Sequence, residues 1–159
     1  MKLVKLDRTD IRILRELQND GSITNVALSK IVGVSPPPCL RRVKALEEAG
    51  YIKGYHADIA AEKLGFGITV YALVSLSNHS ENDIANFAKA LEGWPQVREA
   101  YLMTGDTDYL LKVVSEDWEA FQKFITGPLS STPNIAHIKS MPAMRRVKYA
   151  PGIPIEDKQ

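Results

Sequence analysis

Basic side chains gather in one short stretch of the sequence. Residues 35–44 read SPPPCLRRVK, in which three prolines precede Arg41, Arg42 and Lys44. Arginine can grip O6 and N7 of guanine at two points or hold a phosphate, whereas lysine acts as a point charge. On an exposed helix these residues have the chemistry of a nucleic-acid contact. The alternative is an ordinary solvated helix face.

A second stretch with possible binding chemistry is TGDTDY, at residues 104–109. Gly105 permits unusual backbone angles, and a turn of this kind can expose N–H groups that receive a carboxylate. Asp106 and Asp108 can receive an ammonium group. Together these features suit a zwitterionic amino acid. They equally suit an ordinary hairpin turn, in which glycine and aspartate are common.

The sequence shows no set of residues typical of a catalytic or metal site. The three histidines are scattered, and no Cys/His cluster has metal-ligand spacing. Neither a phosphate-binding glycine loop nor a Gly-x-Ser-x-Gly elbow occurs. We therefore predict a protein that is not an enzyme and that holds no metal and no cofactor.

Composition and charge narrow the class of protein further. No apolar run approaches the roughly 20 residues that span a bilayer, and residues 1–10 do not resemble a secretory signal. Cys39 is the single cysteine and cannot form an intramolecular disulfide. We expect a cytoplasmic protein with no membrane partner. Residues 1–54 carry ten Lys/Arg and six Asp/Glu (10 − 6 = +4), and residues 55–159 carry ten and thirteen (10 − 13 = −3). The split predicts a basic module that contacts a polyanion, joined to an acidic one.

The basic third has the start and stop signals of three helices. Asp7 and Asp10 have the spacing of a capping box, Thr24 can cap a second helix, and Gly33 can end it. The turn GVS then leads to the proline stretch, whose following apolar positions Leu40, Val43 and Leu46 lie three apart. This layout is typical of a helix-turn-helix, although three short helices also occur without a DNA role. YIKGYHADI (51–59) predicts a short strand or hairpin.

The prolines raise the question of where the third helix begins. A proline at the first turn loses little, because the first N–H groups of a helix have no intrahelical partner. Each proline also disfavours the helical conformation of the residue before it. We therefore predict that Pro36 and Pro37 are extended, that regular helix begins at Pro38, and that the Ser35 hydroxyl is free to meet a phosphate. We place Arg41, Arg42 and Lys44 on the face away from Leu40.

The acidic two thirds alternate strands with helices. The pattern predicts strands at 68–77, 97–104, 109–115 and 135–141, and helices at 80–93 and 116–125. The order β-α-β-β-α-β is the ferredoxin-like arrangement, with helices on one face of an antiparallel sheet. We expect Tyr71, Leu73 and Leu111 on the other face, covered by a second copy of the chain. The predicted fold is thus α+β, with a helix-turn-helix domain at 1–54, a linker at 55–67 and a ferredoxin-like domain at 68–159.

Taken together, these stretches resemble the Lrp/AsnC family of feast/famine regulators. Residues 6–55 resemble the winged-type helix-turn-helix domain of that family, and MTGDTDYLLKV (103–113) resembles its effector-domain signature. The resemblance implies a transcription regulator that binds double-stranded DNA as a homo-oligomer, a dimer assembling to an octamer. It implies a small effector, an amino acid in most members, at subunit contacts. The DNA-binding positions are then Ser35, Pro36, Pro37, Arg41, Arg42 and Lys44. The effector-binding positions are Leu102, Thr104, Gly105, Asp106 and Asp108.

Three departures from the family pattern concern proline. The run of three at 36–38 is longer than usual in the family. Gly127-Pro128 stands where the family helix continues, so we expect that helix to kink or end early. Pro142 removes a donor from the last strand. The competing interpretation from another class is a metabolite-binding regulatory module of an enzyme, which the ferredoxin-like half alone would allow.

Overall fold

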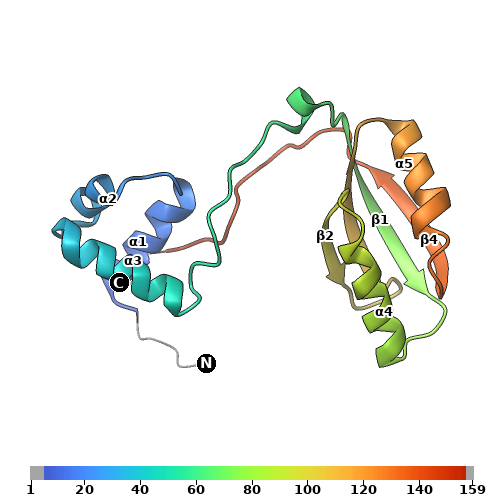
Figure 1. The fold of residues 1–159 in the computed structure, drawn as a ribbon, viewed down its shortest axis with the longest axis horizontal. Coiled ribbons are helices and arrows are strands. Elements are labelled where there is room, and N and C mark those ends of the chain that lie inside the picture. Colours follow the sequence, from blue (N-terminus) through green and yellow to red (C-terminus); the bar gives the residue numbers. More distant parts are fainter. Residues whose placement is uncertain (1–5, 157–159) are drawn as a thin grey trace. The chain divides into compact units, whose positions relative to one another are not determined.

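The computed structural model describes residues 6–156, which form two compact units (Figure 1). The chain divides between Asp58 and Ile59, inside the predicted linker, and again between Val147 and Lys148. The elements in chain order are α1 (Arg8–Asn19), α2 (Asn25–Val32), α3 (Pro36–Glu48), the 3-10 helix η1 (Ala61–Leu64), β1 (Ile68–Leu76), α4 (Glu81–Glu92), β2 (Val97–Leu102), β3 (Tyr109–Ser115), α5 (Trp118–Phe124), the π-helical turn η2 (Ile125–Leu129) and β4 (Ile135–Pro142). None of the helices in residues 6–156 is long and apolar enough to cross a membrane.

The first unit contains the three predicted helices, and their boundaries follow the local signals. The Asp7 carboxylate accepts from the Asp10 N–H and the Asp10 carboxylate accepts from the Asp7 N–H, which confirms the capping box. The Thr24 hydroxyl accepts from the Ala27 N–H and so caps α2. Gly33 ends α2 with a φ of 78°, in the left-handed region that favours glycine.

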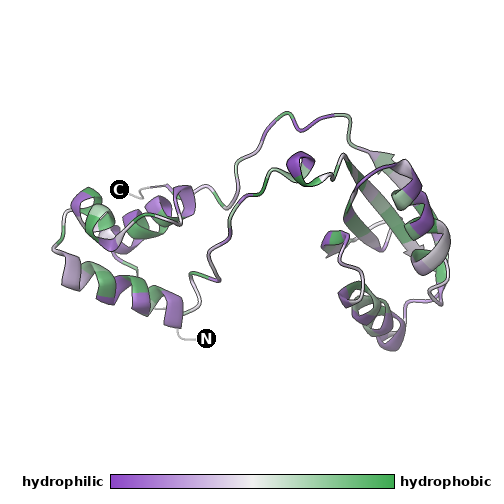
Figure 2. Cartoon of the chain, turned by 45° about the horizontal axis from the view of Figure 1, so that its top comes forward, coloured by the Kyte–Doolittle hydropathy of each residue, from purple (hydrophilic) through white to green (hydrophobic). Residues whose placement is uncertain are grey.

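A small apolar core joins these helices. Its buried residues come from all three of them: Ile13, Leu28, Val32, Cys39 and Leu46. Hydrophobic and hydrophilic residues interleave along each helix in Figure 2, as expected where one face is buried and the other exposed.

The predicted strand or hairpin at 51–59 is wrong, since no described residue of the first unit forms a strand. Tyr51 and Ile52 instead pack against the helical core. The Tyr55 hydroxyl donates to the Glu47 carboxylate at 2.8 Å, and burial together with this bond raises the pKa of Tyr55 to about 12. Tyr51 and Ile52 are therefore used by the helices, and neither of them pairs with a second strand.

Residues 148–156 also belong to the first unit, although the sequence pattern groups them with residues 68–147. We call this segment the C-terminal strap. The Gln18 side chain holds it at two points: Nε2 donates to the Ile153 carbonyl at 2.8 Å, and Oε1 accepts from the Ile153 N–H at 2.9 Å. Because the bonded groups of the strap are backbone atoms, no side-chain periodicity marks it in the sequence.

The second unit is an antiparallel sheet with strand order β2-β3-β1-β4, covered on one face by α4 and α5 (Figure 1). This is the predicted ferredoxin-like arrangement. The Ser80 hydroxyl accepts from the Asp83 N–H and starts α4 where the sequence predicts. Gly127-Pro128 lies in η2, where the Ser130 N–H donates five residues back to the Ile125 carbonyl at 3.0 Å. The helix therefore ends early as a regular α-helix, as expected.

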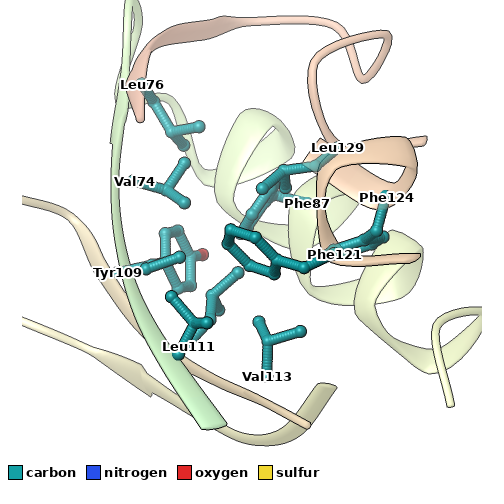
Figure 3. Close-up of a cluster of buried hydrophobic side chains, with 11 residues drawn as sticks. Val74, Leu76, Phe87, Tyr109, Leu111, Val113, Phe121, Phe124 and Leu129 are labelled. Carbon is teal, nitrogen blue, oxygen red and sulfur yellow. The ribbon is translucent and has the colours of Figure 1, made fainter. Parts of the chain in front are cut away.

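The core of the second unit lies between the sheet and its two helices (Figure 3). Phe87 of α4 and Phe121 and Phe124 of α5 meet the inward side chains of β1 and β3. The sequence places Leu111 on the opposite face of the sheet, which is wrong, because Leu111 is fully buried in this core. Its partner in the register is Ala72, whereas Leu110 pairs with Leu73. Successive side chains of a strand point to opposite faces of the sheet, so an error of one position in the sequence assigns a side chain to the wrong face.

Pro142 stands at the end of β4, opposite Val70. Because β4 is an edge strand, the missing N–H interrupts no central ladder. The next residue, Ala143, still donates to the Thr69 carbonyl at 2.9 Å. The strand therefore ends at the proline, in line with the prediction.

Candidate nucleic-acid interface and effector turn

Helix α3 begins at Pro36, so the predicted start at Pro38 is wrong. The first N–H that needs a partner inside the helix belongs to Cys39, and it donates to the Ser35 carbonyl at 3.2 Å. The three prolines thus occupy the positions whose N–H groups would have had no intrahelical partner. Proline disfavours the helical conformation of the residue before it, but here its lack of an N–H costs the helix no hydrogen bond, and the helix forms.

Ser35 is the N-cap of α3, with an extended backbone and an exposed side chain. A serine in this position normally accepts from an N–H two or three residues ahead, but here those residues are prolines. Its hydroxyl accordingly makes no capping hydrogen bond. The structure therefore leaves this hydroxyl exposed, as predicted.

A side chain from α2 fixes the first turn of α3. Asn25 Nδ2 donates to the Pro36 carbonyl at 2.9 Å. Asn25 is the first residue of α2, so the bond joins the starts of the two helices of the helix-turn-helix. Sequence reasoning missed this contact, because a single asparagine at a helix start carries no signal of a partner eleven residues away.

The buried face of α3 differs from the predicted one by a single position. Cys39 and Leu46 are fully buried and Val43 packs beside them, which is the i, i+4, i+7 spacing of one helix face. Leu40, predicted to point inward, is 44% exposed. Burial raises the pKa of the Cys39 thiol, which fits a packed residue rather than a reactive one.

Arg42, one of the predicted DNA contacts, has partners within the protein. Its Nη1 lies 2.7 Å from Asp7 Oδ2 and 2.7 Å from Asp10 Oδ1. The pKa of Asp7 is lowered, first by the hydrogen bond from the Asp10 N–H and further by the bond and charge of Arg42. The two carboxylates are those of the capping box, so Arg42 ties α3 to the start of α1.

Arg41 and Lys44 lie on the exposed side of α3, together with Pro36 and Pro37. Within residues 6–156 neither of the two cations forms an ion pair or a side-chain hydrogen bond. The exposed face of this helix therefore offers two uncompensated positive charges, and its N-terminal end offers the Ser35 hydroxyl.

Asp108 is the best-connected residue of the second candidate site. Its Oδ2 accepts from the Leu76 N–H at 2.7 Å, and its Oδ1 lies 3.0 Å from His79 Nε2. Its own N–H donates to the Val74 carbonyl at 3.1 Å. The side chain is 20% exposed. These contacts hold the turn against the end of β1, a role that the sequence did not indicate.

Residues 104–106 of the turn are exposed. Gly105 has a φ of 114°, so the unusual backbone conformation expected of it is confirmed. Thr104 and Asp106 are exposed, and Leu102 is 60% exposed. The N–H groups of Gly105 and Asp106 donate to no other residue in the described part of the chain. The turn thus combines free backbone donors, an exposed carboxylate and an uncovered leucine.

The sheet face opposite the helices carries large side chains with little cover. Tyr71 of β1, Tyr101 of β2 and Met141 of β4 are among its exposed residues. Lys112 pairs with Glu99 across β3 and β2, and this bond is the main cause of the lowered pKa of Glu99. One face of the sheet is thus left uncovered within the described residues of a single chain.

Comparison with known proteins identifies both units. The Lrp/AsnC ligand binding domain matches residues 69–153, and a winged helix-turn-helix DNA-binding domain matches residues 6–53. The chain belongs to the Lrp/AsnC family. It is a DNA-binding transcriptional regulator with a ligand-binding domain, and members of this family are transcriptional regulators rather than enzymes. The alternative of a regulatory module of an enzyme is not supported.

Individual relatives cover nearly the whole chain. The leucine-responsive regulatory protein of Rhizobium meliloti is 46% identical over 147 residues, which are 92% of this chain and 94% of that protein. The Bkd operon transcriptional regulator of Pseudomonas aeruginosa is 40% identical over 96% of this chain and all of its own length. A transcriptional regulator of Neisseria meningitidis, solved as an L-Met complex, is 37% identical with a TM-score of 0.90, and the match covers 94% of this chain and 97% of that one.

Proposed function

We propose that the exposed side of α3 is the DNA contact surface of this Lrp/AsnC regulator. The proposal rests on which basic side chains of α3 form ion pairs with the protein and which do not. Arg41 and Lys44 are exposed and uncompensated, whereas Arg42 is held by two carboxylates. Arg41 and Lys44 contact phosphates or base edges in the major groove. Ser35, Pro36 and Pro37 lie against the DNA backbone, and Arg42 positions the helix.

Gel-shift measurement of DNA affinity over a range of salt concentrations tests this surface. Binding of a positively charged surface to DNA weakens with salt, with a slope of about 0.9 per phosphate contact. Arg41→Ala and Lys44→Ala should each weaken binding and reduce the slope by about one if they contact phosphate. Lys89→Ala, a change in the last turn of α4, is the matched control and should leave the slope unchanged. If both α3 variants bind like the wild type, the contact surface lies elsewhere.

We further propose that the turn at 104–109 binds a small zwitterion, in particular an amino acid. The free N–H groups of Gly105 and Asp106 receive the carboxylate, and the exposed Asp106 carboxylate receives the ammonium group. Leu102 and Thr104 line the site. Asp108 holds the turn in place through Leu76 and His79. The Neisseria relative, solved with L-Met, supports this class of effector.

The open position of the turn leads us to propose that a neighbouring subunit completes the site. The exposed sheet face is a surface on which two copies can pair, and the resulting dimer assembles further toward an octamer. An effector at such a contact changes DNA affinity only if it favours one assembly or shape over another, a coupling of typically about 1–3 kcal/mol. Mass measurement in solution, with Tyr71→Glu as the disrupting variant, tests the pairing. A variant that still dimerises would refute this surface.

A thermal-shift screen of the twenty amino acids tests the effector proposal. A ligand that binds the folded state raises its apparent stability, by about 2.7 kcal/mol at one hundred times Kd. We expect at least one amino acid to raise the melting temperature of the wild type. Asp106→Ala should abolish that rise without changing the melting temperature of the free protein. If the amino acid still raises the melting temperature of Asp106→Ala, the binding site does not lie at this turn.

A further inference from the structure

The exposed face of α3 is partly apolar, a feature that phosphate binding does not use. Pro37, Leu40, Arg41 and Lys44 occupy positions i, i+3, i+4 and i+7, the spacing of one helix face. All four are exposed, and Leu40 is 44% exposed. An aliphatic side chain therefore stands between a proline and two cations.

Leu40 is not part of the packing that holds this unit together. The core that α3 contributes to is filled by Cys39, Val43 and Leu46, and Leu40 does not belong to it. A single exposed leucine is common on protein surfaces. This one is unusual in its surroundings, because Pro36 and Pro37 extend the apolar surface by one turn and have no N–H to offer to a phosphate.

The chemistry of the major groove offers one apolar group to such a side chain. The base edges there present donors and acceptors, together with the C5-methyl group of thymine. Among the exposed residues of the face, Arg41 and Lys44 match the polar groups. Leu40 matches only the methyl group.

We propose that Leu40 is a specificity-determining residue that selects thymine in the operator by contact with its C5-methyl group. The inference rests on the proposed function, because it requires that this face of α3 enters the major groove. It deepens that function by giving the operator a chemical requirement: a pyrimidine methyl at the base pair that faces Leu40. Arg41 and Lys44, which follow Leu40 on the same face, hold the helix in register.

The test uses duplexes selected from a random pool with the full-length wild-type protein. In the selected sequence, each thymine is replaced in turn by deoxyuridine, which removes the methyl group and leaves the base pairing unchanged. The synthetic duplexes contain no 5-methylcytosine, so thymine is the only source of the methyl. Burial of one such carbon is worth about 0.8 kcal/mol, which corresponds to about a fourfold change in Kd. We expect that loss at one position of each half-site.

Three variants then assign the effect to the side chain. Leu40→Ala should bind the thymine duplex less tightly and show no further loss on the deoxyuridine duplex. Leu40→Met, which keeps an apolar side chain of similar size, should retain the sensitivity to deoxyuridine. Leu64→Ala, at a leucine of η1 that is 66% exposed, is the control and should behave like the wild type on both duplexes. Because Leu40 lies outside the core, the melting temperature of Leu40→Ala should match that of the wild type.

The outcomes separate this inference from the function on which it rests. If the wild type selects no duplex at low salt, the proposed DNA contact fails. If it binds a duplex in which no thymine is sensitive to deoxyuridine, or if Leu40→Ala keeps the full sensitivity, only the role of Leu40 is overturned.

Discussion

The contrast between two adjacent arginines gives the sharpest prediction. Arg42→Ala removes a guanidinium that binds Asp7 and Asp10, whereas Arg41→Ala removes one without an ion-pair partner in residues 6–156. We expect Arg42→Ala to destabilise the first unit. We propose that Arg42 positions the helix, so its effect on DNA binding should follow from that loss of stability.

The size of the effect follows from the exposure of the two carboxylates. The Asp10 side chain is only 13% exposed, and a hydrogen bond to a charged group in such a position contributes about 1.5–3 kcal/mol. The Asp7 side chain is 51% exposed, so its pairing contributes less than about 1 kcal/mol. A total of about 2 kcal/mol should lower the melting temperature of a unit of this size by roughly 8–16 °C.

The pH dependence gives an independent check. The pKa of Asp7 in the folded protein lies below its ordinary value of 3.8. The stabilisation is therefore complete above pH 3.8 and is lost as the pH falls through the lower, folded value. Denaturant unfolding at pH 7 should show a large difference in unfolding free energy between Arg42→Ala and the wild type. As the pH falls below 3.8, that difference should shrink.

Arg41→Ala is the matched control for both measurements. It should unfold within about 0.5 kcal/mol of the wild type at every pH, because it removes no protein contact. It should nevertheless bind DNA more weakly. The reasoning is refuted if Arg42→Ala is as stable as the wild type while its DNA binding is lost, since Arg42 would then contact the DNA directly.

Three further outcomes are expected. Asp108→Ala should lower the stability of the second unit by about 1–3 kcal/mol in denaturant unfolding, because the buried Leu76 N–H loses its acceptor; unchanged stability would leave Asp108 free for the effector. Gly152→Ala should release the C-terminal strap, since a Cβ there would clash with Gln18 Oε1 and φ is 92°; amide hydrogen exchange at 153 should accelerate, and an unchanged rate would contradict the role of Gln18 in holding the strap. Cys39, fully buried with a raised pKa, should react with a thiol reagent only upon unfolding, and rapid reaction of the native protein would contradict its burial.

Local signals in the sequence predicted the ends of the elements well. The capping pair Asp7 and Asp10, the cap at Thr24 and the glycine at 33 each act within one turn of the chain, so their effect can be read from a few residues. The order of strands and helices followed in the same way from periodicity. The start of α3 was misplaced because two local rules conflict at the prolines, and only the first intrahelical bond, from Cys39, decides between them.

Contacts between distant segments could not be read from the sequence. Arg42 meets a carboxylate that is thirty-two residues away in the chain, and the partner of Asp108 on β1 is equally distant. The inward face of a strand or helix depends on register, which is why Leu40 and Leu111 were each assigned to the wrong side. The sequence therefore suggests candidate residue types, but it does not show which of these side chains are paired within the fold and which are left unpaired.

The C-terminal strap has a consequence for how the protein is made. It belongs to the DNA-binding unit but follows the whole ligand-binding unit in the chain, so the ribosome delivers it after every strand of the sheet. Until then, Ile11 and Leu14 of α1, which line one cavity together with residues 153–156, lack these neighbours. The regulator therefore completes its DNA-binding unit only after its ligand-binding unit has been synthesised.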